Sequence, residues 1–441
     1  MKIDTQRMKR WGAGIDVSYL LLCATLSAIS VVTLFSVAQY GGLTYSGGLG
    51  NYRPAVTQIF ASLLGLAGAV LLSFLDYRKL AKLWPVHTAV CWGLVLLTFI
   101  PGVGYEPGGT GSQSWIAMPF GMSFQPTEIA KISFYLGFAS HLSQVHDTLS
   151  RPKSLFPVLL HLLCPVLIVH FQGDDGTAMV FLVIGVVMLF IAGLNRWVVI
   201  SCTAVVLAAL PLIWRFVVSA HQKERIFGLF FPEQYRLTTM HQQLRGRVAI
   251  GAGQLFGRGL FQPEHYYVPR PENDFILSYF AESCGFVGCV VVLLLLFGLM
   301  AKTVRAAAKA EDYVGAYLCI GVFATMLFQS IINIGMNLML LPVMGLTLPF
   351  ISAGGTSVLM LYLSIGLVLS VSRVAKREKG SRALEEKSKK KPMGSKRQWQ
   401  HNYCRLSTTK AIAIPCSCVR ERCAVRPFSS QNAAALPLSC K

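Results

Sequence analysis

Charged residues are scarce in this sequence. Asp, Glu, Lys and Arg together make up 14% of the 441 residues, whereas about 25% is usual for a soluble globular domain. Apolar residues reach 54%, and they gather in blocks of roughly 18 to 24, the length of helix that crosses a hydrocarbon layer of about 30 Å. These proportions exclude an ordinary soluble fold and predict an all-α, polytopic integral membrane protein.

The sequence also lacks the marks of a disulfide-bonded or processed protein. Of its twelve cysteines, seven lie in or beside apolar blocks and five in the C-terminal tail, so none falls in the middle of a predicted external loop. A cysteine buried in a membrane usually acts as a small apolar side chain. Residues 1–16 are basic and lead into a full-length apolar block, without the cleavage site of a signal peptide. We therefore expect the first helix to stay as an anchor.

About ten apolar blocks qualify as membrane spans. They lie at 17–38, 56–75, 86–102, 124–143, 155–171, 177–194, 197–219, 275–300, 313–336 and 351–372. The connection 220–274 is far longer than the others, and loops of that length in compact proteins are usually functional. The sequence therefore predicts that this segment carries chemistry.

Lys and Arg are concentrated in alternate connections. They occur at the N-terminus and after the second, fourth, sixth and eighth spans, and the other short connections hold almost none. The positive-inside rule then predicts that both termini are cytoplasmic and that 220–274 lies on the outer face of the membrane. Residues 373–441 carry 17 Lys or Arg against 4 Asp or Glu, which predicts a disordered cytoplasmic tail attracted to anionic lipid. We expect this charge to meet the membrane and not nucleic acid.

Polar residues inside or beside apolar blocks are candidates for function, because burying them in lipid is costly. Gln125, Glu128 and Lys131 form the first group. Glu128 and Lys131 are one helical turn apart, so they either form a structural ion pair or line a substrate cavity with Lys131 available to a phosphate. In the second group, Asp174 either caps the next helix or, with Asp175, recruits a divalent cation such as Mg²⁺ or Mn²⁺.

The third group stands where the long connection enters the eighth span. Asp274, Ser278 and Glu282 recur every fourth residue along one predicted helix face. Asp274 either caps this helix or serves as a functional carboxylate at the membrane rim.

The fourth group lies in and after the ninth span. Gln329, Asn333 and Asn337 form a similar row, and a Gly- and Ser-rich stretch containing Ser352 follows. Such a row either holds helices together or lines a cavity.

These groups, in this order, resemble the SEDS family (shape, elongation, division and sporulation), to which RodA, FtsW and SpoVE belong. The resemblance covers roughly residues 15–375. It rests on Ser114-Trp115-Ile116 with QPTEIAK (125–131), GDDGTA (173–178), VAIGAGQLFGRG (248–259), NDFILSYFAESCGFVG (273–288) and QSIINIGM to PFISAGGTS (329–357). Five such stretches in register on ten spans are highly specific.

The resemblance implies a peptidoglycan glycosyltransferase that joins lipid II units, with inversion, on the outer face of the inner membrane. The family's essential aspartate falls on Asp274, which the resemblance implies is the general base. No cofactor is required by the sequence. The cations that we expect near the pyrophosphate are Lys131, Arg245, Arg247, Arg258 and Arg270. Other expected substrate-binding residues are Gln125, Glu128, Glu282 and Ser352.

Departures from the family's pattern occur at several of these stretches. Ser114, Gly173 and Asp175 stand where many members have Arg, Pro and Leu, and Arg245 and Gly246 stand for Gln-Ser. Arg270, Glu272 and Asn273 replace the usual Glu, His and Thr around the aspartate.

The resemblance also implies a partner, a class B penicillin-binding protein that makes the peptide crosslinks. The chain itself has no transpeptidase motif, so crosslinking must come from elsewhere. The stretches NIGM (333–336) and QPTEIAKI look more like RodA, the elongation member, than FtsW, the division member. The alternatives are a lipid II flippase, a scaffold that recruits cell-wall enzymes, and an O-antigen-type polymerase. A flippase should show internal repeats, and none is convincing in this sequence.

Overall fold

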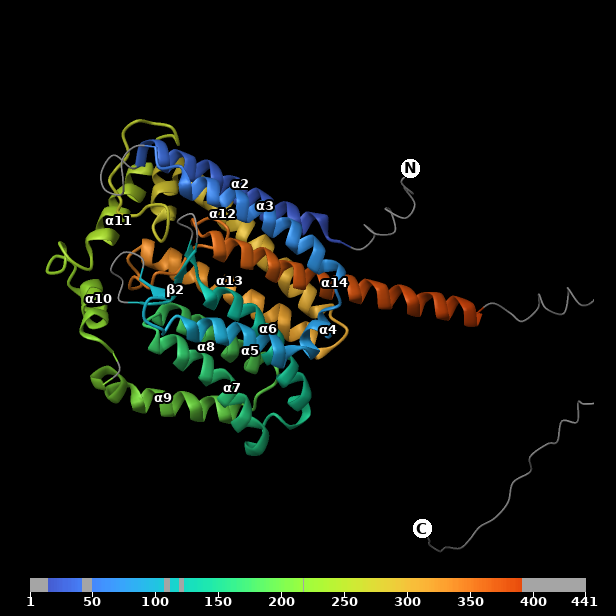
Figure 1. Cartoon of the computed structure of the whole chain (residues 1–441). Coiled ribbons are helices and arrows are strands. Elements are labelled where there is room, and N and C mark those ends of the chain that lie inside the picture. Colours follow the sequence, from blue (N-terminus) through green and yellow to red (C-terminus); the bar gives the residue numbers. More distant parts are fainter. Residues whose placement is uncertain (1–14, 42–49, 107–111, 119–122, 217, 391–441) are drawn as a thin grey trace, which may run out of the picture. The chain divides into compact units, whose positions relative to one another are not determined.

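The computed structural model describes residues 15–41, 50–106, 112–118, 123–216 and 218–390. One compact unit extends to Ser381, and a second begins at Arg382. Within the first unit the chain is a bundle of helices, with one small sheet (Figure 1).

The elements of the first half alternate long helices with short connections. In order they are α2 (Val17–Ser36), a π-helical turn (Val37–Gly41), α3 (Arg53–Phe74), α4 (Tyr77–Lys82), α5 (Trp84–Leu97), β1 (Gly104–Tyr105), β2 (Trp115–Ala117), β3 (Ser123–Phe124), α6 (Pro126–Val145), a 3-10 turn (His146–Thr148), α7 (Pro152–Phe171) and α8 (Asp175–Ile191). The strands form an antiparallel sheet in the order β1-β2-β3, with Gly104 opposite Ile116 and Ile116 opposite Phe124.

The second half contains the two longest helices. In order its elements are α9 (Arg196–Phe216), α10 (Ala220–Phe230), α11 (His241–Gly253), α12 (Ile276–Ala308), α13 (Tyr313–Asn337) and α14 (Gly355–Lys390). Residues 220–274 therefore contain two helices, α10 and α11. A capping box between Ser219 and Gln222 begins α10.

Each of the ten predicted spans coincides with one helix. Six helices are long and apolar enough to cross a membrane, namely α2, α3, α7, α12, α13 and α14. Shorter apolar helices lie at Trp84–Leu97, Asp175–Ile191 and Leu207–Phe216, and α6 begins with the charged Glu128 and Lys131. The expected polytopic, all-α membrane architecture is confirmed.

Helix α13 lies at the centre of the contacts that build the site. It packs against α6, α8 and α12, while α12 also packs against α2 and α11. Elsewhere, α14 approaches α3 closely, since a Cβ added at Gly366 would lie 2.7 Å from the Cα of Ala69. Small residues at such crossings let helix backbones pack closely in a membrane.

Helix α12 is interrupted at Gly285, which has φ 68° and ψ −171°. The residues after α11 pair with the interruption: the amides of Phe286 and Val287 donate to the carbonyls of Gln254 and Leu255. Irregular backbone within a membrane-spanning helix requires such partners, because lipid supplies none. The segment 254–259 is thus fixed against α12.

The C-terminal tail differs in part from the expectation. We predicted disorder from residue 373 onward, but α14 continues to Lys390. The sequence there is rich in Ala, Leu, Glu, Lys and Arg, which all favour helix. Residues 391–441, where the rest of the predicted tail falls, lie outside the described residues.

Candidate functional site

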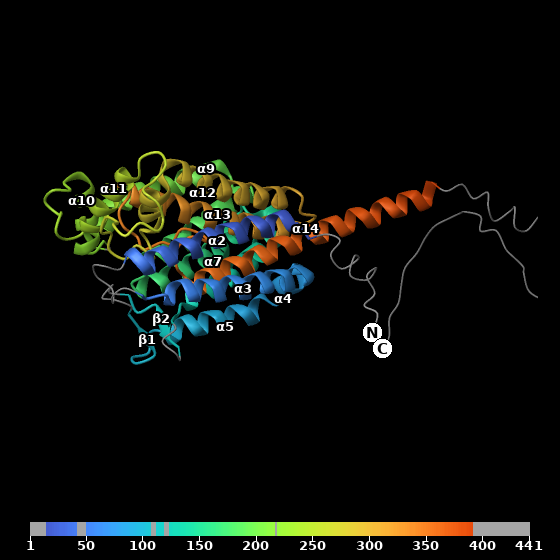
Figure 2. The same cartoon turned by 90° about the horizontal axis from the view of Figure 1, so that it is seen from above.

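Asp274 lies directly before α12, which begins at Ile276. Helices α10 and α11 lie together at one end of the bundle (Figures 1 and 2). Its backbone carbonyl accepts hydrogen bonds from the side-chain amides of Asn333 and Asn337, both at 3.0 Å. Asn333 also donates to the carbonyl of Leu346, and Asn337 accepts from Ser278. The polar row of α13 therefore fixes the backbone on which Asp274 stands.

The carboxylate of Asp274 is left unengaged by these contacts. It makes no hydrogen bond to any residue that the structure describes, and the N-cap of α12 is Phe275, without a side-chain cap. Asp274 therefore does not cap the helix. The side chain is half-buried, and burial raises the pKa of its carboxyl to about 6, against the opposing effects of Arg270 and Arg225.

Glu128 and Lys131 form the ion pair that one of their two interpretations predicted. The Lys131 ammonium donates to the Glu128 carboxylate at 2.8 Å, and both side chains are almost completely buried on α6. Asp174 caps α8, as one of its two interpretations predicted, by accepting from the amide of Thr177 at 3.0 Å. Its other oxygen accepts from the side chain of Gln125 at 3.0 Å, which ties the start of α6 to that of α8.

The neighbouring residue Asp175 forms a separate polar group. Its carboxylate lies 2.5 Å from Nδ1 of His170 on α7 and accepts from the Gln222 side chain on α10. One turn later on α10, Arg225 donates to the carbonyl of Val343 at 2.7 Å. Burial lowers the pKa of Arg225, and the negative charges of Asp274 and Asp175 oppose this.

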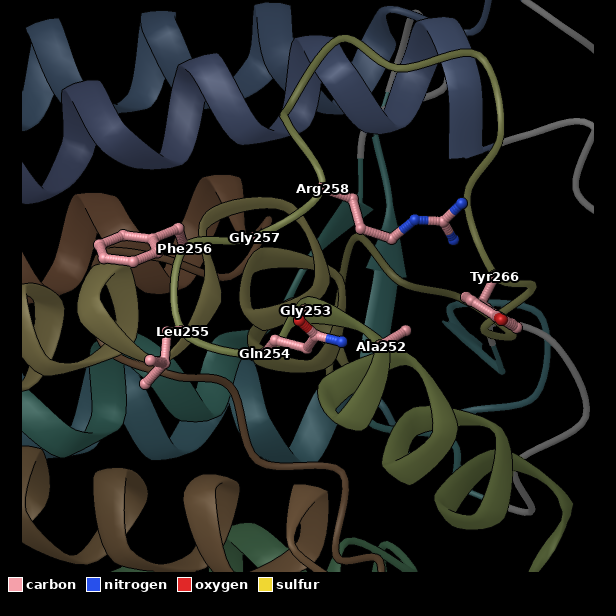
Figure 3. A pocket seen from close by; sticks show the side chains of 8 residues that line it. All are labelled: Ala252, Gly253, Gln254, Leu255, Phe256, Gly257, Arg258 and Tyr266. Atoms are coloured by element: carbon pink, nitrogen blue, oxygen red, sulfur yellow. The ribbon is translucent and has the colours of Figure 1, made fainter.

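Glu282 and Arg258 meet beside a pocket of about 550 Å³, lined by residues 252–258 and Tyr266 (Figure 3). The Arg258 guanidinium is 3.4 Å from the buried Glu282 carboxylate and stacks over the Tyr266 ring at 5.1 Å. The amide of Tyr266 also donates to Glu282. Asp274, Ser278 and Glu282 therefore do not form one site. Ser278 contacts Asn337, while Glu282 contacts Arg258, which lines this pocket.

The remaining candidates take different positions. Arg245 and Arg247 are exposed on α11, and Arg270 is exposed in the loop before Asp274. Ser352 is buried, and its hydroxyl accepts from the amide of Leu348 within a turn. Among the described residues, no group of three or more His, Cys, Asp or Glu side chains could hold a metal ion. The possibility of a divalent cation at Asp174 stays a prediction.

Several residues of the site were not singled out from the sequence. Arg225 and Gln222 carry no motif, and their only signal is a place in the long connection. His170 lies near the end of α7, shortly before the GDDGTA stretch. Gln243 was also missed. Its buried side chain donates to the carbonyls of Met336 and Leu341, so it joins α11 to the end of α13.

Comparison with known proteins gives one family. The family model FTSW_RODA_SPOVE, described as "Cell cycle protein", matches residues 16–377. A protein of Geobacter sp. (strain M18), "Probable peptidoglycan glycosyltransferase FtsW", is 31% identical over 367 residues, which are 81% of this chain and 97% of that protein.

Solved structures agree with this match. One, described as "Structural coordination of polymerization and crosslinking by a peptidoglycan synthase complex", is 27% identical with a TM-score of 0.69, covering 82% of this chain and 99% of that one. The rod shape-determining protein RodA of Thermus thermophilus is also 27% identical, with a TM-score of 0.59 and coverage of 82% and 98%.

Proposed function

Because the chain belongs to the SEDS family of FtsW, RodA and SpoVE, we propose that it is a peptidoglycan glycosyltransferase that polymerises lipid II. The reaction joins a sugar hydroxyl of one lipid-linked unit to the anomeric carbon of another. The sugar–phosphate bond breaks, and the lipid pyrophosphate leaves. The Geobacter relative named a peptidoglycan glycosyltransferase supports this activity over nearly its whole length.

We propose Asp274 as the general base. A sugar hydroxyl is a poor nucleophile, and a carboxylate within hydrogen-bond reach can accept its proton as attack begins. The observation that carries this proposal is the environment of Asp274. Its backbone carbonyl accepts hydrogen bonds from Asn333 and Asn337, and its carboxylate makes no hydrogen bond to a described residue. Burial raises the pKa of this carboxyl to about 6. A base with that pKa is ionised at neutral pH and still basic enough to take up a proton.

The site is proposed to face the outside of the inner membrane, with both termini in the cytoplasm. Basic residues support this orientation, because Lys302 and Arg305 lie near the end of α12 that is opposite to Asp274. Lys302 pairs there with Asp16 at 2.8 Å, close to the start of α2. Lys and Arg are retained on the cytoplasmic side of membrane proteins.

A class B penicillin-binding protein is the proposed partner, since a glycan polymerase alone leaves strands without crosslinks. A solved relative described as coordinating polymerization and crosslinking supports this pairing. The role in elongation stays a prediction, because relatives named FtsW and RodA match this chain at similar identity. Depletion of the protein should give rounded cells if it serves elongation, and filaments if it serves division.

The deciding experiment separates a polymerase from a flippase. The protein, purified with its partner in detergent, is given labelled lipid II, and the products are separated on a gel. Detergent leaves no membrane to cross, so glycan chains require transferase activity. Transport of lipid II after reconstitution into vesicles, with no chains formed in detergent, would instead support the flippase.

A further inference from the structure

Helix α10 is attached to the rest of the site by two polar contacts. The Gln222 side chain accepts from the Ser219 amide at 2.8 Å and donates to Asp175 at the start of α8. One turn further, Arg225 donates to the carbonyl of Val343 at 2.7 Å. Asp175 stands where the family usually has Leu, so the first of these contacts is a feature of this chain.

The segment 343–345 brings Arg225 close to Asp274. Arg225 donates to the carbonyl of Val343. Gly176 lies beside the following carbonyl, that of Met344, because a Cβ added at Gly176 would be 2.3 Å from its oxygen. A Cβ added at Gly345 would be 3.9 Å from a carboxylate oxygen of Asp274. Arg225 and Asp274 thus flank one short segment, and the mutual effect of their charges agrees with this placement.

The two charges are neighbours without being an ion pair. No contact of 4.0 Å or less joins the Arg225 guanidinium to the Asp274 carboxylate. Inverting transfer needs this separation, because the attacking hydroxyl and the leaving phosphate stand on opposite sides of the anomeric carbon. A base and a leaving-group cation placed too close together would neutralise each other.

Arg225 is also better suited to bind an anion than Lys131 or Arg258. Lys131 is buried against Glu128, and Arg258 is engaged by Glu282 and Tyr266. Arg225 is half-buried, and within the described part of the chain its only hydrogen bond goes to a neutral carbonyl. A guanidinium binds phosphate oxygens with two parallel N–H groups, and a partly desolvated one gains most from doing so.

We propose that Arg225 binds the diphosphate of the lipid-linked donor beside Asp274, and that Asp175 positions Arg225 by holding α10. In the transfer, the acceptor hydroxyl gives its proton to Asp274 and its oxygen bonds to the anomeric carbon. The bond from that carbon to the phosphate oxygen breaks, and its electron pair leaves on the diphosphate, which Arg225 stabilises. This inference rests on the proposed function.

The test uses the purified full-length protein with its partner, lipid II as substrate, and inorganic pyrophosphate as the probe of the anion site. Arg225→Gln removes the cation, and Arg225→Lys keeps the charge without the two-pronged geometry. Arg236→Gln is the matched control, because Arg236 belongs to the same long connection and its side chain is 70% exposed. Thermal unfolding of each variant shows whether it is folded.

We expect Arg225→Gln to lower kcat/KM by about 10- to 100-fold, the loss expected for a hydrogen bond to a charged group. Inhibition by pyrophosphate should weaken by a similar factor, Arg225→Lys should fall between, and Arg236→Gln should match the wild type. Asp175→Leu should also weaken pyrophosphate inhibition. Asp175→Asn should restore it, since the amide oxygen can still accept from Gln222.

The pH profile gives a readout that a purely structural role would not move. The charges that act on Asp274 are Arg270 and Glu272 from its own loop and Arg225 from α10, while α13 presents only neutral amides. Removing Arg225 removes a cation that favours the ionised form of Asp274. The midpoint of kcat/KM against pH should therefore move upward in Arg225→Gln.

The proposal is overturned if Arg225→Gln equals Arg236→Gln in kcat/KM, pyrophosphate inhibition and pH midpoint. A wild-type protein that makes no chains would refute the proposed function instead. Calorimetric binding of pyrophosphate still decides the anion site in that case: binding that Arg225→Gln loses supports it, and binding that the variant keeps refutes it.

Discussion

Polymerisation by this protein should depend on pH through Asp274. Its carboxyl has a pKa of about 6 in the folded protein, against an ordinary value of 3.8. Only the ionised form can accept a proton, and that form is about one part in eleven at pH 5, half at pH 6 and ten parts in eleven at pH 7. The value of kcat/KM should therefore rise roughly tenfold between pH 5 and pH 7, with a midpoint near 6.

The assay is the initial rate of chain formation from limiting lipid II between pH 4.5 and 8, with binding of lipid II measured separately at each pH. Protonation of Asp274 must lower the rate of chain formation while lipid II stays bound. A rate that is constant from pH 5 to pH 7, with binding also constant, would contradict the assignment of Asp274 as the base. A midpoint near 4 would contradict the effect of burial on its pKa.

Two further predictions concern stability, measured as thermal unfolding in detergent. Lys131→Met should destabilise the protein by about 3–5 kcal/mol, because it leaves the buried Glu128 carboxylate without its partner; Glu128→Gln combined with Lys131→Met should recover most of this, and a double variant no better than the single one would refute the pairing argument. Gly257→Ala should cost about 1–3 kcal/mol, since Gly257 has φ +82° and an added Cβ would lie 2.2 Å from the Ser283 carbonyl. The control Gly251→Ala, where nothing lies within 4 Å, should be neutral or slightly stabilising, and equal losses in the two variants would show that the segment 254–259 is not fixed against α12.

The sequence predicts the bundle well because the signal for a span is local. Each helix that crosses lipid must be apolar along its own length, so ten blocks lead to ten helices without knowledge of their packing. The row Asn333 and Asn337 is visible for the same reason, as polar residues four apart in an apolar block. Its partner, the carbonyl of Asp274, is not visible, because that contact depends on how α12 and α13 pack.

The features that the sequence does not predict all depend on contacts between distant segments. The interruption of α12 at Gly285 exists because residues after α11 pair with it, and glycine alone does not reveal that pairing. The position of Arg225 likewise depends on its hydrogen bond to the carbonyl of Val343 and on the charge of Asp175, and both residues lie far from it in the chain. Among several arginines in the long connection, composition gives no reason to choose this one.

The most direct test of the account compares the wild type with Asp274→Asn in the same lipid II assay. Asn keeps the size of the side chain but cannot accept the proton, and it removes the cost of a half-buried charge. The account predicts a variant that unfolds at the same or a higher temperature at pH 7.5, still binds lipid II, and makes no glycan chains. Normal chain formation by this folded variant would contradict the central claim that Asp274 is the catalytic base.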